Sequence, residues 1–588
     1  MPTPTPPEKA PAAASSAAKK KPAAEQAKID SRHLRGGLRE GLDLDGGFAK
    51  AELPVLKFHG IYQQENRDER QARRAAGLAK EHTFMVRVAL PGGAMSAEQY
   101  LALDGLADAH ADGSLRLTTR QGVQFHGTGK GDLKPVVQTI HDALLTTFAA
   151  CGDVRRNVMA CPAPLPGGAR RQLLEVASAI ARELEPKTNA YHEIWLDGEK
   201  QQLTDGAEPF YGDAYLPRKF KIGLATEDDN SVDAYTQDCA LVAIVEDDAI
   251  VGFHLLAGGG LGMTHNKPDT FARIASPVGT VEPHLAVDAV RAVAAIFRDH
   301  GNRQDRRHAR LKYLIEEWGL ERFRRELEAH LGAPLGEPLP APRPHQHDYL
   351  GVHDQAGGGV FYGLWIENGR LRDDARRGVR RIVERFRPGV RVTPGQSLLF
   401  TDLTRDQIPE LESIVRDHGL ETVDRLPQAV RGSMACPALP TCGLALAEAE
   451  RQLPATGRLL ATALAERGAD DVPIIVRMTG CPNGCARPYN ADIAFVGRKP
   501  GVYHVFVGGG IAGDRLADLW LADVPENALV SCLDPLLDRY ADERLDGETL
   551  GDFYRRVGGG PPTRHRLTGR EVPAGESWQS ADLEGARP

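Results

Sequence analysis

The chain contains an internal duplication, and this feature constrains its fold more than any other. The stretch "LRLTTRQGVQFH" at 115–126 matches "VRVTPGQSLLFT" at 390–401, which lies 275 residues further along. The same offset carries "MACPA" at 159–163 onto an identical "MACPA" at 434–438. Two matches at one offset predict that a unit of the fold occurs twice.

A third pair of marks follows in the same order. Apolar runs end in glycine triplets in "LLAGGG" and "VFVGGG", whose last residues are Gly260 and Gly510. Their offset is 250 residues, so the first copy carries about 25 additional residues between these marks. The second triplet lies in "VGGGIAG", a formal G-x-G-x-x-G match, but no acidic residue ends a following strand at the required distance. We therefore assign the glycines to the repeat rather than to a dinucleotide site.

Each copy shows the same order of predicted strands and helices. "FMVRVAL" and "SLRLTT" alternate as half-buried strands do, and "SAEQYLALDGLADAHAD" between them has helical periodicity with Ser96 as its N-cap. The second copy repeats the order with "GVFYGLWIE", "DARRGVRRIVERF" and "VRVTPGQSLLF". The sequence therefore predicts a pseudo-two-fold α+β protein with a ligand near the internal axis.

The two copies differ in the residues that could carry chemistry. Arg120 of the first copy becomes Gly395 in the second. Cys161 matches Cys436, but the first copy has no counterpart of Cys442. A lysine pair in "PRKFK" lies in the additional material of the first copy. One copy thus keeps the thiols and the other keeps the cations.

The second copy holds four cysteines in two pairs, Cys436 with Cys442 and Cys481 with Cys485. The pairs enclose five and three residues, and 38 residues separate them. Proline and glycine around both pairs favour tight loops, so four thiolates can converge on tetrahedral zinc or on an iron–sulfur cluster. The five-residue gap fits zinc poorly and favours the larger cluster.

Composition limits the remaining function classes. The chain has a formal net charge of −8, yet Arg and Lys gather in stretches such as "LPRKFK" and "NRQDRRHARLK". In an acidic protein these stretches indicate a local anionic ligand rather than a nucleic-acid surface. No apolar run reaches the length of a membrane span and no secretory signal is visible, so we expect a cytoplasmic protein. Residues 1–35 are rich in Ala, Pro and Lys and are predicted to form a disordered tail.

At this point the motifs resemble a known family. "MACPALPTCGLALAEAER" and "VRMTGCPNGCARPYNADIAFVG" are similar to the two signatures of the sulfite and nitrite reductases that contain sirohaem and a 4Fe–4S cluster. The similarity extends to "LKFHGIYQQENRDER", "LRLTTRQGVQFHG", "GDVRRNV", "YLPRKFK" and "HGNRQDRRHARLKYLIEEWG".

The resemblance implies a duplicated nitrite/sulfite reductase fold. It has two ferredoxin-like half-domains and two α+β domains that bind sirohaem and the cluster. Beyond the tail we expect an N-terminal arm, a first half-domain, a sirohaem and substrate domain, a second half-domain and a cluster domain, at 36–75, 76–146, 147–345, 346–425 and 426–588.

The resemblance also implies the roles of individual residues. The four cysteines of the second copy would bind the cluster, and Cys485 would also be the axial thiolate shared with the sirohaem iron. Further contacts to sirohaem, a ring with many carboxylates, are implied for Arg116, Arg120, Gln124, Arg310 and Asn483. The catalytic cations above the haem are implied to be Arg87, Arg156, Lys219 and Lys221.

The function implied is the six-electron reduction of sulfite to sulfide. Lys221 favours sulfite over nitrite, because plant-type nitrite reductases carry Asn or a similar residue at that position. Nitrite reduction is the alternative, and a non-catalytic iron–sulfur or tetrapyrrole protein is a third hypothesis. Electrons would come from a partner, with ferredoxin favoured over a flavoprotein subunit. We expect no nucleic-acid or membrane partner, and we interpret Cys161 as a packed free thiol.

Overall fold

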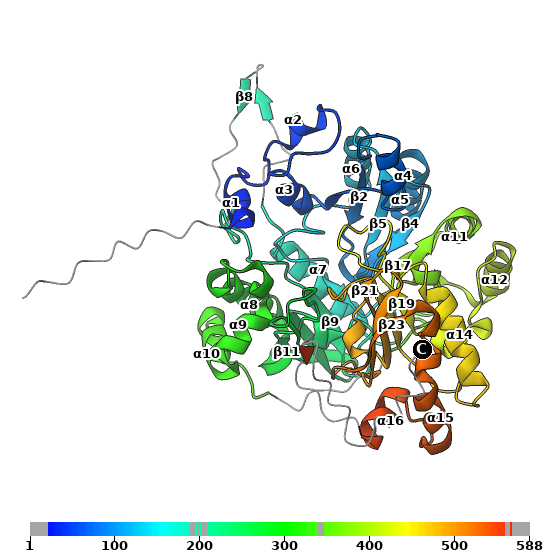
Figure 1. Cartoon of the computed structure of the whole chain (residues 1–588). Helices are drawn as coiled ribbons and strands as arrows, with labels where there is room; N and C mark the ends of the chain where they lie inside the picture. Colours follow the sequence, from blue (N-terminus) through cyan, green and yellow to red (C-terminus); the bar gives the residue numbers. More distant parts are fainter. Residues whose placement is uncertain are drawn as a thin grey trace, which may run out of the picture.

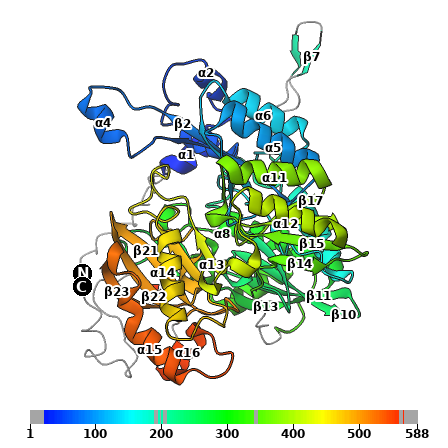
Figure 2. The same cartoon turned by 90° about the vertical axis from the view of Figure 1, so that its right-hand side faces the viewer.

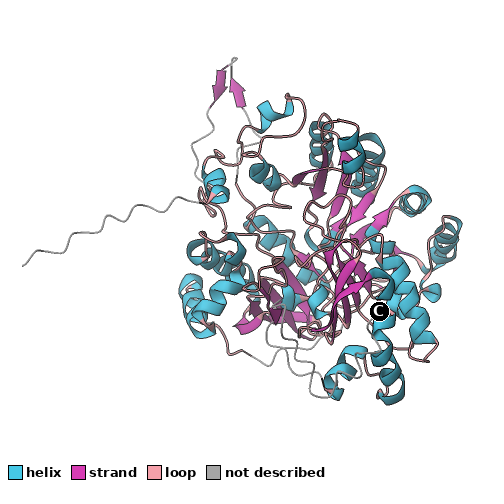
Figure 3. Cartoon of the chain, in the orientation of Figure 1, coloured by secondary structure: helices cyan, strands magenta, loops and turns pink. Residues whose placement is uncertain are grey.

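The computed structural model describes residues 22–187, 194–196, 199–201, 208–338, 346–558 and 565–566. Helices and strands are mixed throughout this part of the chain (Figure 3). No helix in the described ranges has both the length and the apolar character needed to cross a membrane. The predicted disorder of residues 1–21 concerns a segment outside the described residues.

Two half-domains of the same construction lie on the right of the molecule in Figure 1, the first near the top and the second below it. Each is an antiparallel sheet covered by two helices. The first consists of β1 (Ile61–Gln64), β2 (Thr83–Val88), α5 (Ala97–His110), β4 (Leu115–Leu117), β5 (Val123–Thr128) and α6 (Leu133–Asp142). The second consists of β14 (Gly351–Asp354), β15 (Val360–Leu364), α11 (Asp373–Phe386), β17 (Gly389–Val392), β18 (Leu398–Leu403) and α12 (Ile408–Asp417).

The half-domains exchange a strand reciprocally. β16 (Arg370–Leu371) of the second copy pairs with β4 of the first, and β3 (Ala94–Met95) of the first pairs with β17 of the second. Helices α5 and α11 lie side by side (Figure 2). One apolar core runs through both sheets, from Val86 and Phe125 to Val390 and Phe400. The two half-domains therefore pack as a single unit around the pseudo-two-fold axis.

The other two domains each contain a five-stranded sheet of identical topology. In both, three parallel strands are followed by antiparallel neighbours. The first sheet consists of β6 (Met159–Ala160), β9 (Ile222–Thr226), β10 (Cys239–Glu246), β11 (Ala249–Ala257) and β13 (Ser276–Val281). The second consists of β19 (Ser433–Ala435), β20 (Val476–Thr479), β21 (Ile493–Lys499), β22 (Val502–Val507) and β23 (Asp518–Pro525). The predicted duplicated fold class is confirmed.

Helices flank these two sheets. The first sheet packs against helices α7 (Ala169–Glu183), α8 (Ala286–His300), α9 (Leu311–Trp318) and α10 (Leu320–Leu331). The second packs against α13 (Gln428–Arg431), α14 (Leu453–Ala465), α15 (Asp534–Glu543) and α16 (Leu550–Val557). Two short pairs complete the strands, β7 (Ile194–Leu196) with β8 (Glu199–Gln201) and β12 (Phe271–Ala272) with β24 (His565–Arg566).

Local sequence signals explain several of these elements. The Ser96 side chain accepts a hydrogen bond from the Gln99 backbone, and the Gln99 side chain accepts one from the Ser96 backbone, which forms the predicted start of α5. The middle glycine of each triplet, Gly259 or Gly509, lies against backbone. A Cβ there would come within 2.4 Å of the Gln237 carbonyl oxygen and 2.3 Å of that of Ala491, respectively. The middle glycines therefore allow two backbone segments to approach each other closely, as expected for a repeated structural feature.

The predicted disordered tail is wrong for residues 22–35. Helix α1 (Ala23–Ile29) is followed by turns that lead through α2 (Leu38–Leu42) and α3 (Leu53–Phe58) to β1, and α4 (Arg70–Ala75) lies beyond it. Glu25 and Lys28 are buried, and the Lys28 ammonium donates to the Leu216 carbonyl at 2.8 Å. The composition of this segment predicts that it buries too little apolar surface to become ordered. Helix α1 is instead held by buried charge pairs, which composition does not reveal.

Candidate active site

Two adjacent strands of the second copy position the four cysteines. β19 and β20 are parallel neighbours with Met434 opposite Arg477, so the loops after them leave from the same edge of the sheet. Cys436 follows β19 directly and Cys481 follows β20 by two residues. Both are buried, whereas Cys442 is half-buried and Cys485 is exposed. The Gly480 backbone donates to the Cys436 sulfur at 3.4 Å, which ties the two loops together.

The four thiols share one electrostatic environment. Burial raises the pKa of Cys436 well above its ordinary value, and the charges of Cys485, Cys481 and Cys442 raise it further. Burial and neighbouring Cys485 likewise raise the pKa of Cys481 to about 12. Such thiols become thiolates only when positive charge is supplied between them, as a metal centre does. The described residues contain no group of three or more His, Cys, Asp or Glu placed around one metal ion, so the case rests on this mutual proximity.

The first copy positions the lysine pair. Lys219 and Lys221 are half-buried and flank Phe220, which is completely buried, in the extended segment that enters β9. Alternation therefore turns both ammonium groups to the same side. The Lys221 backbone donates to the Asp238 carboxylate at 2.8 Å and fixes this segment.

Neighbouring cations and one thiol act on the pKa of the two lysines in opposite directions. Burial lowers the pKa of Lys219 to about 7, and Arg310, Arg218 and Arg156 contribute in the same direction. Burial lowers the pKa of Lys221 well below its ordinary value, and Lys219 is the next largest cause. The charge of Cys485 opposes the shift in both lysines. Cys485 thus lies within electrostatic range of the other three cysteines and of the lysine pair.

Arg87 and Arg156 lie beside a tyrosine and a cysteine that sequence reasoning did not assign to the site. Arg87, on β2, donates to the Cys151 sulfur at 2.7 Å, and its guanidinium lies 5.9 Å from the centre of the Tyr62 ring. A hydrogen bond to Tyr62 and the charge of Cys151 help to raise the pKa of Arg156 against the effect of burial. Tyr62 lies in one of the family-like stretches, which is the only sequence signal that pointed to it.

The structure separates Arg156 from its neighbour in sequence. Arg155 is buried against Tyr211 on the other side of the segment, and burial lowers its pKa. Arg156 is half-buried and contributes to the lowered pKa of Lys219. Of the two, Arg156 belongs with the cations of the pocket.

Arg120 and Arg310 add positive charge near the lysine pair, and Gln124 lies beside Arg87. Arg310 forms a bidentate ion pair with Asp238 at 3.0 and 2.8 Å. Burial together with Arg156, Arg487 and Arg310 lowers the pKa of Arg120 to about 9. The Gln124 amide oxygen accepts from Arg87 Nε at 2.8 Å in the amide orientation that satisfies both groups.

Arg116 and Asn483, also implied as cofactor contacts, lie next to the thiol loops. The Arg116 guanidinium is buried, forms an ion pair with Glu450 and donates to the Ala435 carbonyl at 2.8 Å. Asn483 stands between Cys481 and Cys485 in the chain, and its polar groups oppose the raised pKa of Cys481. Their role as cofactor contacts stays a prediction.

Cys161 lies apart from the four thiols. Its sulfur donates to the Asp229 carbonyl at 3.2 Å, and burial followed by the charge of Asp229 raises its pKa well above the ordinary value. Cys161 is completely buried. This fits a packed free thiol.

The donor sets fit the two groups that the motifs imply. Cys436, Cys442 and Cys481, whose pKa values burial and the charge of Cys485 raise, suit an iron–sulfur cluster together with Cys485. Clustered cations that lower one another's pKa suit a ligand with several carboxylates or an oxyanion. Cys485 connects the sets, and the Thr119 hydroxyl of the first copy donates to its carbonyl at 3.0 Å.

Comparisons with known proteins agree with this arrangement. A family model described as the nitrite and sulphite reductase 4Fe-4S domain matches residues 175–335 and 429–560. A second, the nitrite/sulfite reductase ferredoxin-like half domain, matches residues 76–143 and 353–418. The solved structure of the Mycobacterium tuberculosis NirA protein superposes with a TM-score of 0.74 at 25% identity, covering 92% of this chain and 97% of that one.

Curated relatives are similar over nearly the whole chain. The sulfite reductase (NADPH) hemoprotein beta-component of Staphylococcus haemolyticus is 43% identical over 543 residues, covering 91% of this chain and 95% of that protein. The proteins of the same name from Geobacillus kaustophilus and Myxococcus xanthus are 43% and 41% identical, each over 91% of this chain and over 95% and 96% of their own length. These names are of the NADPH type and do not support the expected preference for ferredoxin.

Proposed function

Because this chain belongs to the nitrite and sulfite reductase family, with its 4Fe–4S and ferredoxin-like domains, we propose that it is the hemoprotein of an assimilatory sulfite reductase. Its cofactors are sirohaem and a 4Fe–4S cluster, in keeping with the family domain and the hemoprotein relatives. Cys436, Cys442, Cys481 and Cys485 hold the cluster in this proposal. The function is the reduction of sulfite to sulfide.

One observation carries the proposal. Cys485 lies within electrostatic range of three other cysteines from the second copy and of Lys219 and Lys221 from the first. In this proposal Cys485 would be among the residues that hold the cluster and the haem. The cations would bind the substrate, and Arg120 and Arg310, which bond to Gln237 and Asp238 in the structure, would also contact the haem carboxylates.

The residues of the chain bind the substrate and deliver protons. Arg87, Arg156 and the two lysines provide fixed positive charge for the sulfite dianion and for negative charge that develops on departing oxygen. A lysine whose pKa is lowered toward 7 gives up its proton more readily at neutral pH than an exposed one. When bound, sirohaem and the cluster would supply the redox chemistry of the reduction.

The electron donor is proposed to be an NADPH-linked flavoprotein subunit. The relatives that support this carry NADPH in their names and are called beta-components, which indicates a separate partner. Ferredoxin is the alternative. Comparison of sulfide formation with each reduced donor, at equal donor concentration, distinguishes them through the higher kcat/KM.

The substrate is tested on the purified, coloured protein with reduced methyl viologen as a donor that needs no docking surface. We expect kcat/KM for sulfite to exceed that for nitrite at least tenfold. The reverse order would assign nitrite reduction, which the family description also covers. A protein that lacks iron and visible absorption, when produced in a host that makes both cofactors, would contradict both assignments.

A further inference from the structure

A second cavity corresponds to the candidate active site through the pseudo-two-fold axis. It has a volume of about 280 Å³. Its lining includes Gly395, Arg431, Pro473, Ile475 and Ser231. Each of these residues is the structural counterpart of a residue of the candidate active site, as two independent offsets establish.

The first offset is the one seen in the sequence. Arg431 stands three residues before "MACPA" of the second copy, as Arg156 does before "MACPA" of the first. Gly395 likewise replaces Arg120 in the matching turn. The second copy therefore keeps an arginine at the position of Arg156, as Arg431, and has no cation at the position of Arg120.

The second offset, 254 residues, comes from the sheets. Met159 is opposite Gly223 and Met434 is opposite Arg477, so Gly223 corresponds to Arg477. The backbone of Lys221 donates to Asp238 at 2.8 Å, and the backbone of Ile475 donates to Asp492 at 2.8 Å. This equivalence relates the lysine pair to Pro473 and Ile475. The expectation that the pair lies in additional material of the first copy is therefore wrong.

The same offset relates the thiol loop to the first copy. Asp233 and Arg487 both adopt left-handed backbone conformations before short 3-10 helices, at φ 50° and 52°. Two residues earlier, Ser231 takes the position of Cys485. The second cavity therefore repeats the backbone geometry of the candidate active site. At the corresponding positions it keeps one cation, Arg431, and has a hydroxyl, Ser231, in place of the thiol, while Arg477 and Arg487 add positive charge to its lining.

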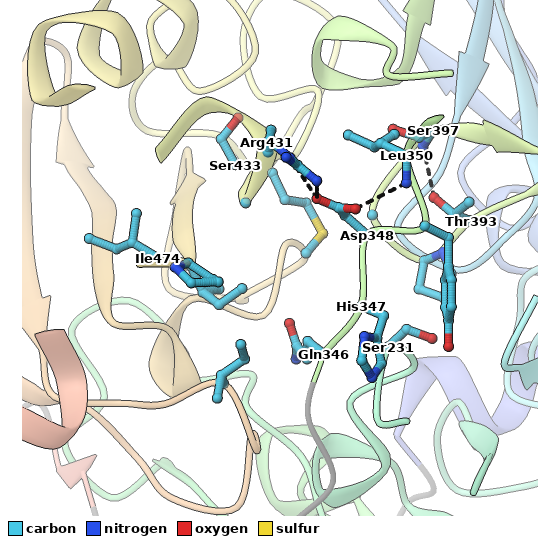
Figure 4. Close-up of a pocket in the computed structure, with 18 of the residues that line it drawn as sticks. Ser231, Gln346, His347, Asp348, Leu350, Thr393, Ser397, Arg431, Ser433 and Ile474 are labelled. Atoms are coloured by element: carbon cyan, nitrogen blue, oxygen red, sulfur yellow. Dashed lines mark hydrogen bonds and ion pairs between the residues drawn. The ribbon is translucent and has the colours of Figure 1, made fainter. Parts of the chain in front are cut away.

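The linker between the two halves of the chain enters this cavity. Figure 4 shows Asp348 joined to Arg431, with Gln346 and His347 along the same segment. The Asp348 carboxylate accepts from Arg431 Nε at 2.9 Å and lies 2.8 Å from Nη2, and it also accepts from the Leu350 backbone at 3.0 Å. The Gln346 side chain accepts from Arg477 at 3.0 Å. A carboxylate of the chain itself thus occupies the position that an anionic ligand of Arg431 would take.

We propose that this cavity is a second oxyanion site whose ligand position is taken by the tethered Asp348 carboxylate. The ligand class is a small oxyanion such as sulfate or phosphate, because Arg431 directs Nε and Nη2 together at one carboxylate oxygen, Asp348 Oδ2. A buried donor nearby, Arg477 Nε, has no hydrogen-bond partner among the residues that the structure describes. The inference concerns the second cavity alone and does not depend on which substrate the active site reduces.

The test removes the tethered charge and measures anion binding. Equilibrium dialysis of the holoenzyme with radiolabelled inorganic phosphate, at constant ionic strength, is carried out on the wild type, D348N, D348N/R431Q and D354N. Asp354 is the matched control, because it pairs with Arg405 on the exposed surface. A tethered ligand acts at millimolar or higher effective concentration, so free phosphate competes poorly in the wild type.

We expect D348N to bind one additional phosphate per chain, at least tenfold more tightly than the wild type binds at that cavity. The additional binding should disappear in D348N/R431Q, and D354N should behave as the wild type. Equal binding by D348N and wild type would overturn the proposal, as would additional binding that persists without Arg431. If D348N does not fold with its cofactors, D348S is expected to give the same gain and is judged by the same criteria.

Discussion

The candidate active site and the second cavity are related by the pseudo-two-fold axis and share a scaffold, but they differ in their side chains. The first combines Lys219 and Lys221 with Cys485, whereas the second has Pro473 and Ile475 at the lysine positions. In both, the same backbone hydrogen bond to a buried aspartate fixes the segment. The shared strand topology gives both places the same backbone shape. A few side chains at corresponding positions determine whether charge and thiols are available there for catalysis.

The aspartates of the two copies also differ in their partners. Asp238 of the first copy holds Arg310 in a bidentate pair, whereas Asp492 of the second accepts from the backbones of Ile475 and Gly551. Burial raises the pKa of Asp492 to about 6. The buried aspartate thus balances an arginine in the first copy, whereas in the second cavity Asp348 of the linker balances Arg431.

The largest expected effect separates Cys485 from its counterpart Ser231. C485S should lower sulfite reduction by at least about 10⁴-fold, because the residue connects the thiols to the cation pocket. S231A should leave activity within about twofold of the wild type. Turnover with reduced methyl viologen, together with the visible spectrum and iron content, checks both. If C485S retained a tenth of wild-type activity, the proposed thiolate link would be wrong.

The lysine pair provides the next comparison. K221M should lower kcat by about 10²- to 10³-fold, since a positioned proton donor and its charge are both lost. I475M, at the corresponding position of the second copy, should leave kcat unchanged. Steady-state kinetics with sulfite measure both variants, and thermal unfolding controls for folding. Comparable losses in the two variants would show that the copies do not differ in function as proposed.

The N-terminal helix α1 contacts the segment that leads into the lysine pair of the candidate active site. Lys28 bonds to the Leu216 carbonyl and forms ion pairs with Glu25 and, at 3.6 Å, with Asp153. K28M leaves those carboxylates short of a buried partner and should reduce the free energy of unfolding by about 3–5 kcal/mol. It should also raise KM for sulfite, because Leu216 leads into the lysine segment. Denaturant unfolding and kinetics check this.

A matched control for Lys28 is Lys130. Its ammonium donates to the Leu44 carbonyl at 2.6 Å on an exposed part of the first half-domain. K130M should change the free energy of unfolding by less than about 1 kcal/mol. A loss of stability in K130M as large as that in K28M would argue against a specific brace.

The smallest expected effect concerns Asp492. Its pKa of about 6 in the folded state lies above the ordinary 3.8, so the folded state binds this proton more tightly than the unfolded state. The resulting stabilisation is present below about pH 4 and is lost as the pH rises through about 6, a change of about 2–3 kcal/mol. D492N should remove this part of the pH dependence. Denaturant unfolding of D492N and wild type between pH 4 and 7 measures the difference, and parallel curves would contradict the assignment.

Sequence reasoning predicted much of the fold because the repeat leaves its marks in order. The helix that begins after Ser96 and the strands of both half-domains lie where periodicity placed them. It missed α1, because the order of that helix depends on Glu25 and Lys28 meeting distant charges. It also missed Tyr62 and Cys151, since neither lies in a spacing pattern that distinguishes a pocket residue from a core residue.

By itself, the sequence determined that the fold is duplicated, that four thiols gather in one copy and that basic segments gather in the other. These features are recorded in spacing, which does not depend on distant contacts. Tertiary structure alone decided that Cys485 lies within electrostatic range of the lysines, that Arg116 pairs with Glu450 and that Asp348 lines the second cavity. The physical reason is that a charge acts on whatever lies within a few ångströms of it, and chain order does not specify those neighbours.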